Sequence, residues 1–552
     1  MHQKSSRVSK NDSFPVWVFW IPALIYILHT LLFRHWIIDD AGISFSYARS
    51  LAGGYGLVSQ PGQPPVEGYT NFGWLVLFVP FFLAHLFHPV LIPKLLSAAA
   101  VLGAGIFLYR AFRNLSTGPT VIFFIFLLLS ICTPFVVWTC SGLENPLMVC
   151  GVSLLFWLTL RIPERPSGTA GLCAAMGFTA AWIAMTRPDG LVYFFVPLAV
   201  LAASGYRREK RGLVYMLSFA LLYGSFIAFR IGYFKDVFPN TYYAKGSPGW
   251  SALMELALLS PGTLAKTSIL FSSLTWKGGF WLLLGLVAAA GYCSGKNAFN
   301  RKDTVVLLFL AASAFAYLFL PVDWMREFRF ATVFFVFAYA AMFLLFDRLM
   351  RLAPIRERIR KKFLWTGLVL FTLASLGLFA KRSLDFSRRP TVPFAEISSN
   401  FGEGFNRCAE RLGLKNASIL LPDLGGTLYF SKMRVIDLSG LCDRTIARTL
   451  GKNNEALHRY VFETVKPDFI HVHDWWSYVS ALHADPRLQE EYAVIHESPD
   501  PWCLERFGAN VLNGDYVRKE LVLNDPAALL FLREQTRRFF EKTASSSDQP
   551  KP

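Results

Sequence analysis

Eleven long apolar stretches are the feature that most constrains what this chain can fold into. Each comes close to the roughly 17–25 residues that a helix needs to cross a bilayer. The bilayer core offers no water to bond with the backbone, so such stretches have to be helical. The sequence therefore predicts an α-helical polytopic membrane protein with about 11 transmembrane helices. The predicted spans are 16–34, 93–110, 119–138, 143–161, 170–186, 190–205, 213–232, 278–294, 304–321, 329–346 and 363–380.

Charge is scarce in this chain and unevenly distributed. Asp, Glu, Lys and Arg make up only 17% of the residues, against roughly 25% in soluble domains. The net charge of +17 comes wholly from residues 1–382, which hold 34 basic and 15 acidic residues, whereas residues 383–552 hold 21 and 23. The basic surplus lies mainly in alternate loops, as in the cytoplasmic loops of membrane proteins. We therefore expect a lipid bilayer, and no nucleic acid, as a partner of this basic chain.

The basic loops also predict the topology. They place the N-terminus in the cytoplasm and, after eleven spans, the C-terminal part outside it. A further apolar stretch, residues 72–87, would invert every later loop if it crossed the bilayer. We therefore predict a juxtamembrane or re-entrant helix on the outer face there. The first outer loop then covers residues 35–71, and the transmembrane domain covers residues 1–382.

We predict that residues 383–543 form a separate, extracytoplasmic α/β domain. This part has the charge content of a soluble domain, and helix-like stretches alternate in it with short apolar ones. Three of its cysteines, Cys408, Cys442 and Cys503, lie outside the cytoplasm on this topology, where one disulfide could form. Residues 544–552 are predicted to be a disordered tail. The expected strands are Ser418–Leu421, Arg434–Leu438, Phe469–Val472, Tyr492–Ile495 and Tyr516–Val522.

The acidic residues of the transmembrane domain point to one polar site on the outer face. Carboxylates are costly near lipid, so their positions are informative. The adjacent Asp39 and Asp40 repel each other, so one of them should have a raised pKa or a cationic partner. A carboxylate there can act as a general base toward a sugar hydroxyl, or the pair may serve only to cap the helix that follows. The nine acidic residues on this face are Asp39, Asp40, Glu67, Glu144, Asp189, Asp236, Glu255, Asp323 and Glu327.

The first outer loop resembles that of a known enzyme family. Its sequence IDDAGISFSYARSLAGGYGLV, followed by PVEGYTNFGW, is similar to the first periplasmic loop of GT-C glycosyltransferases. Within that superfamily it resembles the mycobacterial terminal arabinofuranosyltransferases and their bacterial relatives, with the pattern DDAxISxRYAxNLxxGxGLVxNPGExVEGYTNxLW. Ser46 replaces the usual Arg of this pattern, and Val322 replaces a common Gly, which leaves the substrate open. Further similar segments are SGLENPL at 141–147, TRPDG at 186–190, FPNTYYAK at 238–245, DWM at 323–325 with RF at 329–330, DLG at 423–425 and VIDLSGL at 435–441.

The resemblance implies both a GT-C fold and a function. It implies an inverting glycosyltransferase that moves a hexosyl or pentosyl group from a polyprenyl-phosphate donor to a cell-envelope glycan or glycolipid acceptor. The reaction would take place on the outer face of the bacterial inner membrane. An acidic residue of the first outer loop would deprotonate the acceptor hydroxyl, and Asp39 and Asp40 match that motif, with the choice between them left open. The sequence has no GxGxxG or P-loop motif, which agrees with a lipid-linked donor.

Other residues on the same face are candidates for substrate binding. A donor phosphate needs cations or amide donors, and aromatic rings could stack on the sugar. Each also has a plainer interpretation, since arginines and aromatic residues near a bilayer surface often act as anchors. Glu144 and Asp189 could simply pair with Arg187. The candidates are Glu67, Tyr69, Asn71, Glu144, Arg187, Asp189, Asn240, Tyr242, Tyr243, Lys245, Asp323, Trp324 and Arg329.

The segment HVHDWW, residues 471–476, looks like part of a metal site. His471 and His473 would share one face of a strand. Two histidines without a third, distant ligand make a weak metal pattern. We therefore expect a polar cluster at a strand end that binds glycan through Trp475 and Trp476. The sequence assigns no cofactor and leaves a divalent cation open.

Two other functions compete with glycosyl transfer. A transporter of lipid-linked sugars would need ionisable residues deep in several spans, or discontinuous helices in repeated halves, and the sequence shows neither. A non-catalytic assembly or regulatory protein could keep a GT-C shell while its C-terminal domain binds a partner. The intact Asp39-Asp40 pair and the PNTYYAK segment argue against such a non-catalytic function.

Overall fold

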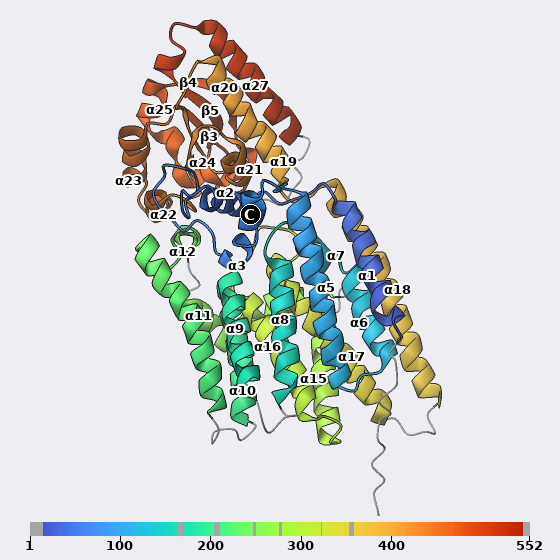
Figure 1. Ribbon diagram of the computed structural model, residues 1–552. Helices are drawn as coiled ribbons and strands as arrows, with labels where there is room; N and C mark the ends of the chain where they lie inside the picture. The colour runs from blue at the N-terminus through green and yellow to red at the C-terminus, as the bar shows by residue number, and fades with distance from the viewer. Residues whose placement is uncertain are drawn as a thin grey trace, which may run out of the picture.

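The computed structural model describes residues 15–162, 169–203, 210–246, 250–274, 279–321, 323–352 and 358–544. A bundle of long helices forms one part of the molecule, and a smaller domain that contains a β-sheet sits on one end of it (Figure 1). The predicted cytoplasmic N-terminal flank up to residue 14, Val322 and residues 545–552 of the predicted tail lie outside the described residues.

Every predicted span contains a helix. Among the described residues, five helices are long and apolar enough to cross a membrane. The pair of α6 (Pro119–Ile131) and α7 (Thr133–Thr139), bent by 67°, would be a sixth, and the predicted number of eleven spans stays a prediction. Two further helices, α13 (Trp250–Ala257) and α14 (Pro261–Ser272), follow α11. The bundle helices are α1 (Trp17–Thr30), α5 (Leu91–Asn114), α6 (Pro119–Ile131), α7 (Thr133–Thr139), α8 (Asn145–Leu160), α9 (Ala170–Thr186), α10 (Phe195–Ala203), α11 (Arg211–Phe234), α15 (Gly279–Gly295), α16 (Arg301–Phe319), α17 (Thr332–Leu352) and α18 (Arg358–Arg388).

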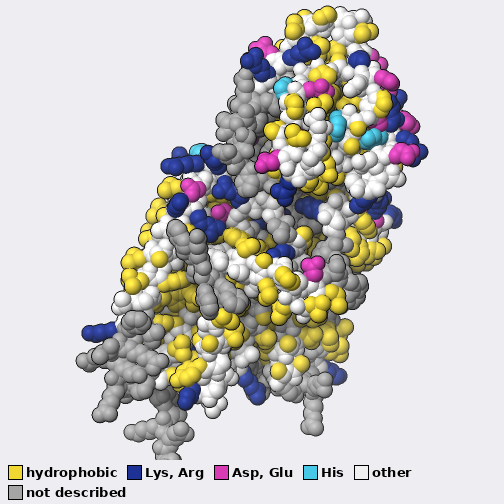
Figure 2. Space-filling model, turned by 180° about the vertical axis from the view of Figure 1, so that it is seen from behind, with side chains coloured by type: hydrophobic (Ala, Val, Ile, Leu, Met, Phe, Trp, Pro, Cys, Tyr) yellow, Lys and Arg dark blue, Asp and Glu magenta, His cyan; other side chains and the backbone are white. Residues whose placement is uncertain are grey.

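The bundle has an apolar exterior as well as an apolar core. The apolar window of α17 is 78% buried, whereas that of α11 is only 11% buried. Leu213, Leu217 and Leu221 recur every four residues along α11 and are exposed, so they form one outward stripe. Hydrophobic side chains cover much of the bundle surface, while charged ones gather at its ends and on the small domain (Figure 2). This is the surface that contact with lipid requires.

The first outer loop folds against the end of the bundle next to the small domain. It contains helix α2 (Ala41–Ala52), which starts directly after Asp40. The juxtamembrane helix predicted over residues 72–87 is wrong as a single helix, because the stretch forms two short ones, α3 (Phe72–Leu75) and α4 (Val79–Leu83). Pro80 lies in the first turn of α4. A proline has no N–H and cannot continue a preceding helix, which explains the break.

The small domain is built on a five-stranded mixed sheet with the strand order β2-β1-β3-β5-β4. Strands β1 (Ser418–Leu421), β2 (Arg434–Asp437) and β3 (Phe469–Val472) lie where they were predicted and run parallel. β4 (Tyr492–Pro499) and β5 (Leu512–Arg518) form an antiparallel pair, and β3 pairs antiparallel with β5. The flanking helices are α19 (Phe394–Ile397), α20 (Glu403–Arg411), α21 (Gly425–Phe430), α22 (Arg444–Thr449), α23 (Asn454–Arg459), α24 (Asp474–Ser480), α25 (Pro486–Glu491), α26 (Pro501–Phe507) and α27 (Pro526–Ala544).

Three details of this domain differ from what the sequence led us to expect. β4 begins at Tyr492 as predicted but continues to Pro499, four residues beyond the predicted end. β5 begins four residues before the predicted strand, at Leu512, because the polar side chain of Asp515 is buried in the sheet beside His471 rather than exposed in a turn. The disulfide that the sequence leaves possible in this domain is not formed, since Cys408 and Cys442 are free thiols.

The first outer loop and the small domain meet without a gap. The backbone N–H of Asp39 donates to Val392 O at 3.0 Å, and that of Phe394 donates to Ile37 O at 2.8 Å. α2 packs on α21 through two glycines, Gly42 and Gly425. A Cβ on Gly42 would lie 2.3 Å from Gly425 O, so only hydrogen atoms fit between the two backbones.

Replacing Gly425 with Ala should loosen this contact, because the new Cβ would lie 1.8 Å from Asp39 O. We expect a loss of about 3 kcal/mol in the free energy of unfolding, visible as a lower melting temperature and faster proteolysis between the two parts. Gly224→Ala on α11 is the control, since its Cβ would meet nothing within 4 Å. Equal melting temperatures for the two variants would contradict the close contact.

Candidate active site

The two aspartates that head the first outer loop have different surroundings. Asp39 is only 6% exposed, and its two carboxylate oxygens accept hydrogen bonds from the backbone N–H groups of Gly425 at 2.9 Å and Gly426 at 2.6 Å. Burial raises the pKa of Asp39 well above its usual range; the Gly426 N–H opposes this effect and the charge of Asp40 adds to it. Asp39 therefore joins the loop to the first turn of α21 in the small domain.

Asp40 is the more accessible carboxylate. Its side chain is 28% exposed, and its Oδ2 lies 3.5 Å from Nη1 of Arg329. Asp40 stands at the N-cap position of α2 but makes no side-chain cap hydrogen bond. The interpretation of this pair as a helix cap is therefore wrong for α2, and the predicted cationic partner is present as Arg329.

A network of ion pairs extends from Asp40 along the end of the bundle. Arg329 Nε lies 3.9 Å from Asp323 Oδ2, and the guanidinium carbon of Arg329 lies 4.9 Å from the centre of the Phe330 ring. Arg187 lies over the same ring, at 4.6 Å. The Phe330 ring thus makes a cation–π contact with each of the two arginines.

The Arg187 side of the network is buried and fully paired. Arg187 donates to Glu144 Oε1 and to Asp189 Oδ1, both at 2.9 Å. Glu144 also accepts a hydrogen bond from Asn71 Nδ2 at 3.1 Å, and Asn71 is bonded to Ser44 of α2. The structure thus brings together seven of the residues that the sequence singled out: Asp40, Asn71, Glu144, Arg187, Asp189, Asp323 and Arg329.

Glu67 and Tyr69 lie in a second buried cluster. Glu67 accepts hydrogen bonds from Arg230 of α11 at 2.6 and 3.1 Å. The Tyr69 ring packs edge-to-face on Tyr47 of α2 at 4.9 Å, and its hydroxyl has no hydrogen-bond partner among the described residues. Sequence reasoning missed Arg230 because it sits inside an apolar helix, where an arginine without a known partner resembles a membrane anchor.

The PNTYYAK segment attaches the small domain to the bundle. It forms α12 (Asn240–Lys245), which packs on α22. Asn240 Nδ2 lies within 3.1 Å of the carbonyl oxygens of Gly440, Leu441 and Asp443. The guanidinium group of Arg448 lies 4.3 Å from the centre of the Tyr243 ring.

The remaining candidates are at the surface. Tyr242 stacks on Phe238 at 4.4 Å and is exposed, as are Lys245 and Trp324. The described contacts of the network around Asp40 include none of these three residues. A role in substrate binding for them, or for α12 as a whole, stays a prediction.

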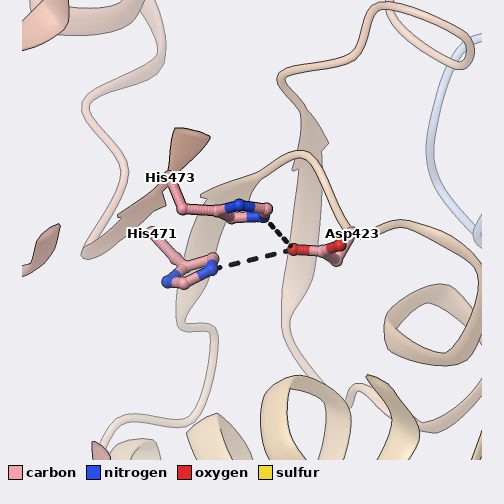
Figure 3. Close-up of side chains that lie close together, drawn as sticks. All are labelled: Asp423, His471 and His473. Atoms are coloured by element: carbon pink, nitrogen blue, oxygen red, sulfur yellow. Dashed lines mark hydrogen bonds and ion pairs between the residues drawn. The ribbon is translucent and has the colours of Figure 1, made fainter. Parts of the chain in front are cut away.

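The two histidines of HVHDWW converge on a third side chain. Asp423, between β1 and α21, places its Oδ2 at 2.8 Å from Nε2 of His473 and 3.7 Å from Nε2 of His471 (Figure 3). Burial alone would lower the pKa of His473, but the charge of Asp423 outweighs it and raises this pKa to about 10. The sequence did not predict this group because Asp423 comes from another strand end, and the three residues meet only when β1 and β3 pair.

The trio could hold a metal ion and lies close to the aspartate pair. One ligand atom from each residue lies within 4.8 Å of the other two. Asp423 is two residues from Gly425, whose N–H binds Asp39, and the charge of Asp423 acts on Asp39. Trp475 is partly exposed at the start of α24, and its ring packs near that of Phe507 at 5.7 Å.

Sequence comparison says little about the family of this chain. Residues 406–518, within the small domain, match a domain of unknown function (DUF8728). No curated protein matches the chain.

Solved structures with the same fold are informative. The archaeal oligosaccharyltransferase AglB from Archaeoglobus fulgidus, in complex with an inhibitory peptide and a dolichol-phosphate, has a TM-score of 0.52 and 12% identity over 82% of this chain and 68% of that chain. ArnT from Cupriavidus metallidurans, bound to undecaprenyl phosphate, has a TM-score of 0.53 and 11% identity over 90% of this chain and 97% of that chain. These neighbours are GT-C glycosyltransferases, so the predicted GT-C fold is confirmed. The likeness does not single out the arabinofuranosyltransferase subgroup.

The Glu67–Arg230 pair offers a test of a structural role. Glu67→Gln should lower the free energy of unfolding by about 3–5 kcal/mol, because it leaves a buried guanidinium group without a counter-charge. The double variant Glu67→Gln/Arg230→Met should lose less than the sum of the two single changes, measured as melting temperatures of the purified protein. A Glu67→Gln protein as stable as the wild type would contradict this role and return Glu67 to the substrate-binding candidates.

Proposed function

We propose that this chain is an inverting glycosyltransferase that moves a sugar from a polyprenyl-phosphate donor to a cell-envelope glycan or glycolipid acceptor. The single observation that carries the proposal is the partly exposed carboxylate of Asp40, paired with Arg329 at the end of a GT-C bundle. Two neighbours in fold support a lipid-linked donor, since AglB was solved with a dolichol-phosphate and ArnT with undecaprenyl phosphate.

Asp40 is our choice for the general base. It accepts the proton of the acceptor hydroxyl while the acceptor oxygen bonds to the anomeric carbon of the donor sugar. The bond from that carbon to the phosphate oxygen breaks in the same step, and the lipid phosphate leaves with the electron pair. A single in-line displacement inverts the anomeric carbon. Asp39 serves as a positioning residue, because both of its oxygens are already engaged by backbone N–H groups.

Arg329 is our choice for the cation that binds the donor phosphate. Its side chain already spans Asp40 and Asp323, at 3.5 and 3.9 Å, which is looser than a close ion pair. A guanidinium group can exchange such a contact for a bidentate bond to phosphate. Arg187 is less suited to this role, because Glu144 and Asp189 already hold it at 2.9 Å on both sides.

The site would face the periplasm of a bacterium, with the N-terminus in the cytoplasm. Supporting this topology, segments that the sequence predicts to be cytoplasmic meet one another. Arg348 pairs with Asp303 at 2.8 Å and donates to Leu115 O at 2.9 Å. The predicted outer-face residues Asp39 and Asn240 instead bind the small domain, which we place outside the cytoplasm.

Asp40→Asn should lower the rate of sugar transfer about 10²–10⁴-fold, because it removes the base without changing the size of the side chain. The assay uses detergent-purified protein with polyprenyl-phosphate hexose or pentose donors chosen by glycan analysis of a deletion strain. Asp385→Asn is the control, since Asp385 is an exposed carboxylate near the same end of the bundle. Full activity of Asp40→Asn would show that Asp40 is not the base, whereas absence of transfer by the wild type would favour a non-catalytic assembly protein.

Arg329→Gln should lower kcat/KM by about 10²–10³-fold, because the charge on the leaving phosphate loses its partner. Arg326→Gln is the matched control: it lies three residues away and donates to the carbonyl of Arg389. The comparison is made at several donor concentrations. Equal losses in both variants would show that Arg329 acts only by holding this region together.

A further inference from the structure

The Asp423–His471–His473 trio has the arrangement of a preformed metal site. One ligand atom from each residue lies within 4.8 Å of the other two. Oδ2 of Asp423 lies 2.8 Å from Nε2 of His473 and 3.7 Å from Nε2 of His471. Zinc binds imidazole nitrogen and carboxylate oxygen at about 2.0–2.2 Å, which in a tetrahedral site places the ligand atoms about 3.3 Å apart. The observed separations of 2.8 and 3.7 Å lie on either side of that value.

A carboxylate supports each histidine from behind. His471 Nδ1 lies 2.6 Å from Oδ1 of Asp515, and His473 Nδ1 lies 3.1 Å from Oδ2 of Asp474. A carboxylate that accepts the Nδ1 proton leaves the Nε2 lone pair free to bind a metal, and this outer contact is typical of metal-binding histidines. The three candidate ligands are thus in place, and so are the two carboxylates, Asp515 and Asp474, that orient the histidines.

The Nε2 atom of His471 provides a second, independent observation. Its side chain is only 2% exposed, and its Nε2 has no hydrogen-bond partner among the described residues, because Asp423 is too far away at 3.7 Å. A buried ring nitrogen without a partner is costly. A metal ion between the three side chains would satisfy this nitrogen and neutralise the Asp423 carboxylate at the same time.

We propose that Asp423, His471 and His473 bind one divalent transition-metal ion, with zinc as the natural occupant. Two imidazole nitrogens and one carboxylate oxygen suit zinc better than magnesium or calcium, which prefer oxygen ligands only. The Asp423 and His473 side chains are 18% and 26% exposed, so the fourth position opens toward solvent. The site therefore has room for a water molecule or an anionic group there.

The position of the ion gives it a structural consequence. It would join the turn from Asp423 to Gly426 to the end of β3. That turn carries the N–H groups of Gly425 and Gly426, which bind Asp39. Zinc would thus strengthen the contact between the small domain and the first outer loop, whether or not the chain transfers sugar.

The test is the metal content of the full-length protein, purified without a polyhistidine tag and dialysed against micromolar zinc. We expect about one zinc ion per chain by elemental analysis, and visible absorption bands of a tetrahedral site after exchange with Co²⁺. His473→Ala and Asp423→Asn should lose the ion, and Asp515→Asn should bind it about 10–100-fold more weakly. His458→Ala is the control and should keep it, since His458 pairs with Asp485 elsewhere in the same domain.

Two outcomes would overturn the proposal. One is a wild-type protein with no more zinc than His473→Ala; the other is a Co²⁺ complex without tetrahedral bands. Should the variants fail to fold, chelation and reloading of the wild type still decide, because removal of the ion should lower its melting temperature and zinc should restore it. A wild-type melting temperature that changes neither on chelation nor on addition of zinc would also contradict the proposal. The trio would then be a cluster of two imidazoles and a carboxylate without an ion. Loss of sugar transfer plays no part in this test.

Discussion

The contact between Asp39 and the first turn of α21 is the interaction on which the rest of this molecule depends. A buried carboxylate that receives two backbone N–H groups joins residues almost 390 positions apart. The glycines make it possible, because any side chain on Gly42 or Gly425 would force the two backbones apart. With Asp39 held in this way, the next residue, Asp40, stays at a fixed place beside Arg329, at the end of the bundle where its charge is only partly desolvated.

Two polar clusters and one further set of hydrogen bonds lie around the contact between Asp39 and α21. The ion-pair network of Arg329 and Arg187 lies on the bundle side. The trio of Asp423, His471 and His473 lies on the side of the small domain. The Asn240 contacts fasten the two parts a second time, through backbone carbonyls of the loop before α22. The small domain is thus part of the candidate site rather than an appendage, since it supplies the groups that hold the first outer loop.

Much of the fold could be predicted because apolar length and charge asymmetry are local properties. The helix in each predicted span and the starts of β1 to β4 follow from the pattern of apolar residues, while the number of spans stays a prediction. The prediction failed where a polar residue is satisfied by a distant partner: the predicted strand began after Asp515, yet Asp515 lies buried in β5 beside His471. In the same way, Glu67 and Asn240 looked like ligand-binding groups, while their observed partners are Arg230 and the backbone of residues 440–443.

By itself, the sequence predicted a membrane protein with a GT-C fold and an acidic loop after its first span, because hydrophobic length, basic loops and a long motif are all properties of consecutive residues. It did not distinguish Asp39 from Asp40, nor connect Asp423 with two histidines about fifty residues away. Only the tertiary structure showed the different surroundings of the two aspartates and the approach of Asp423 to the histidines. The reason is physical: the role of a carboxylate depends on its burial and on the donors around it, and those donors come from segments that are neighbours only after folding.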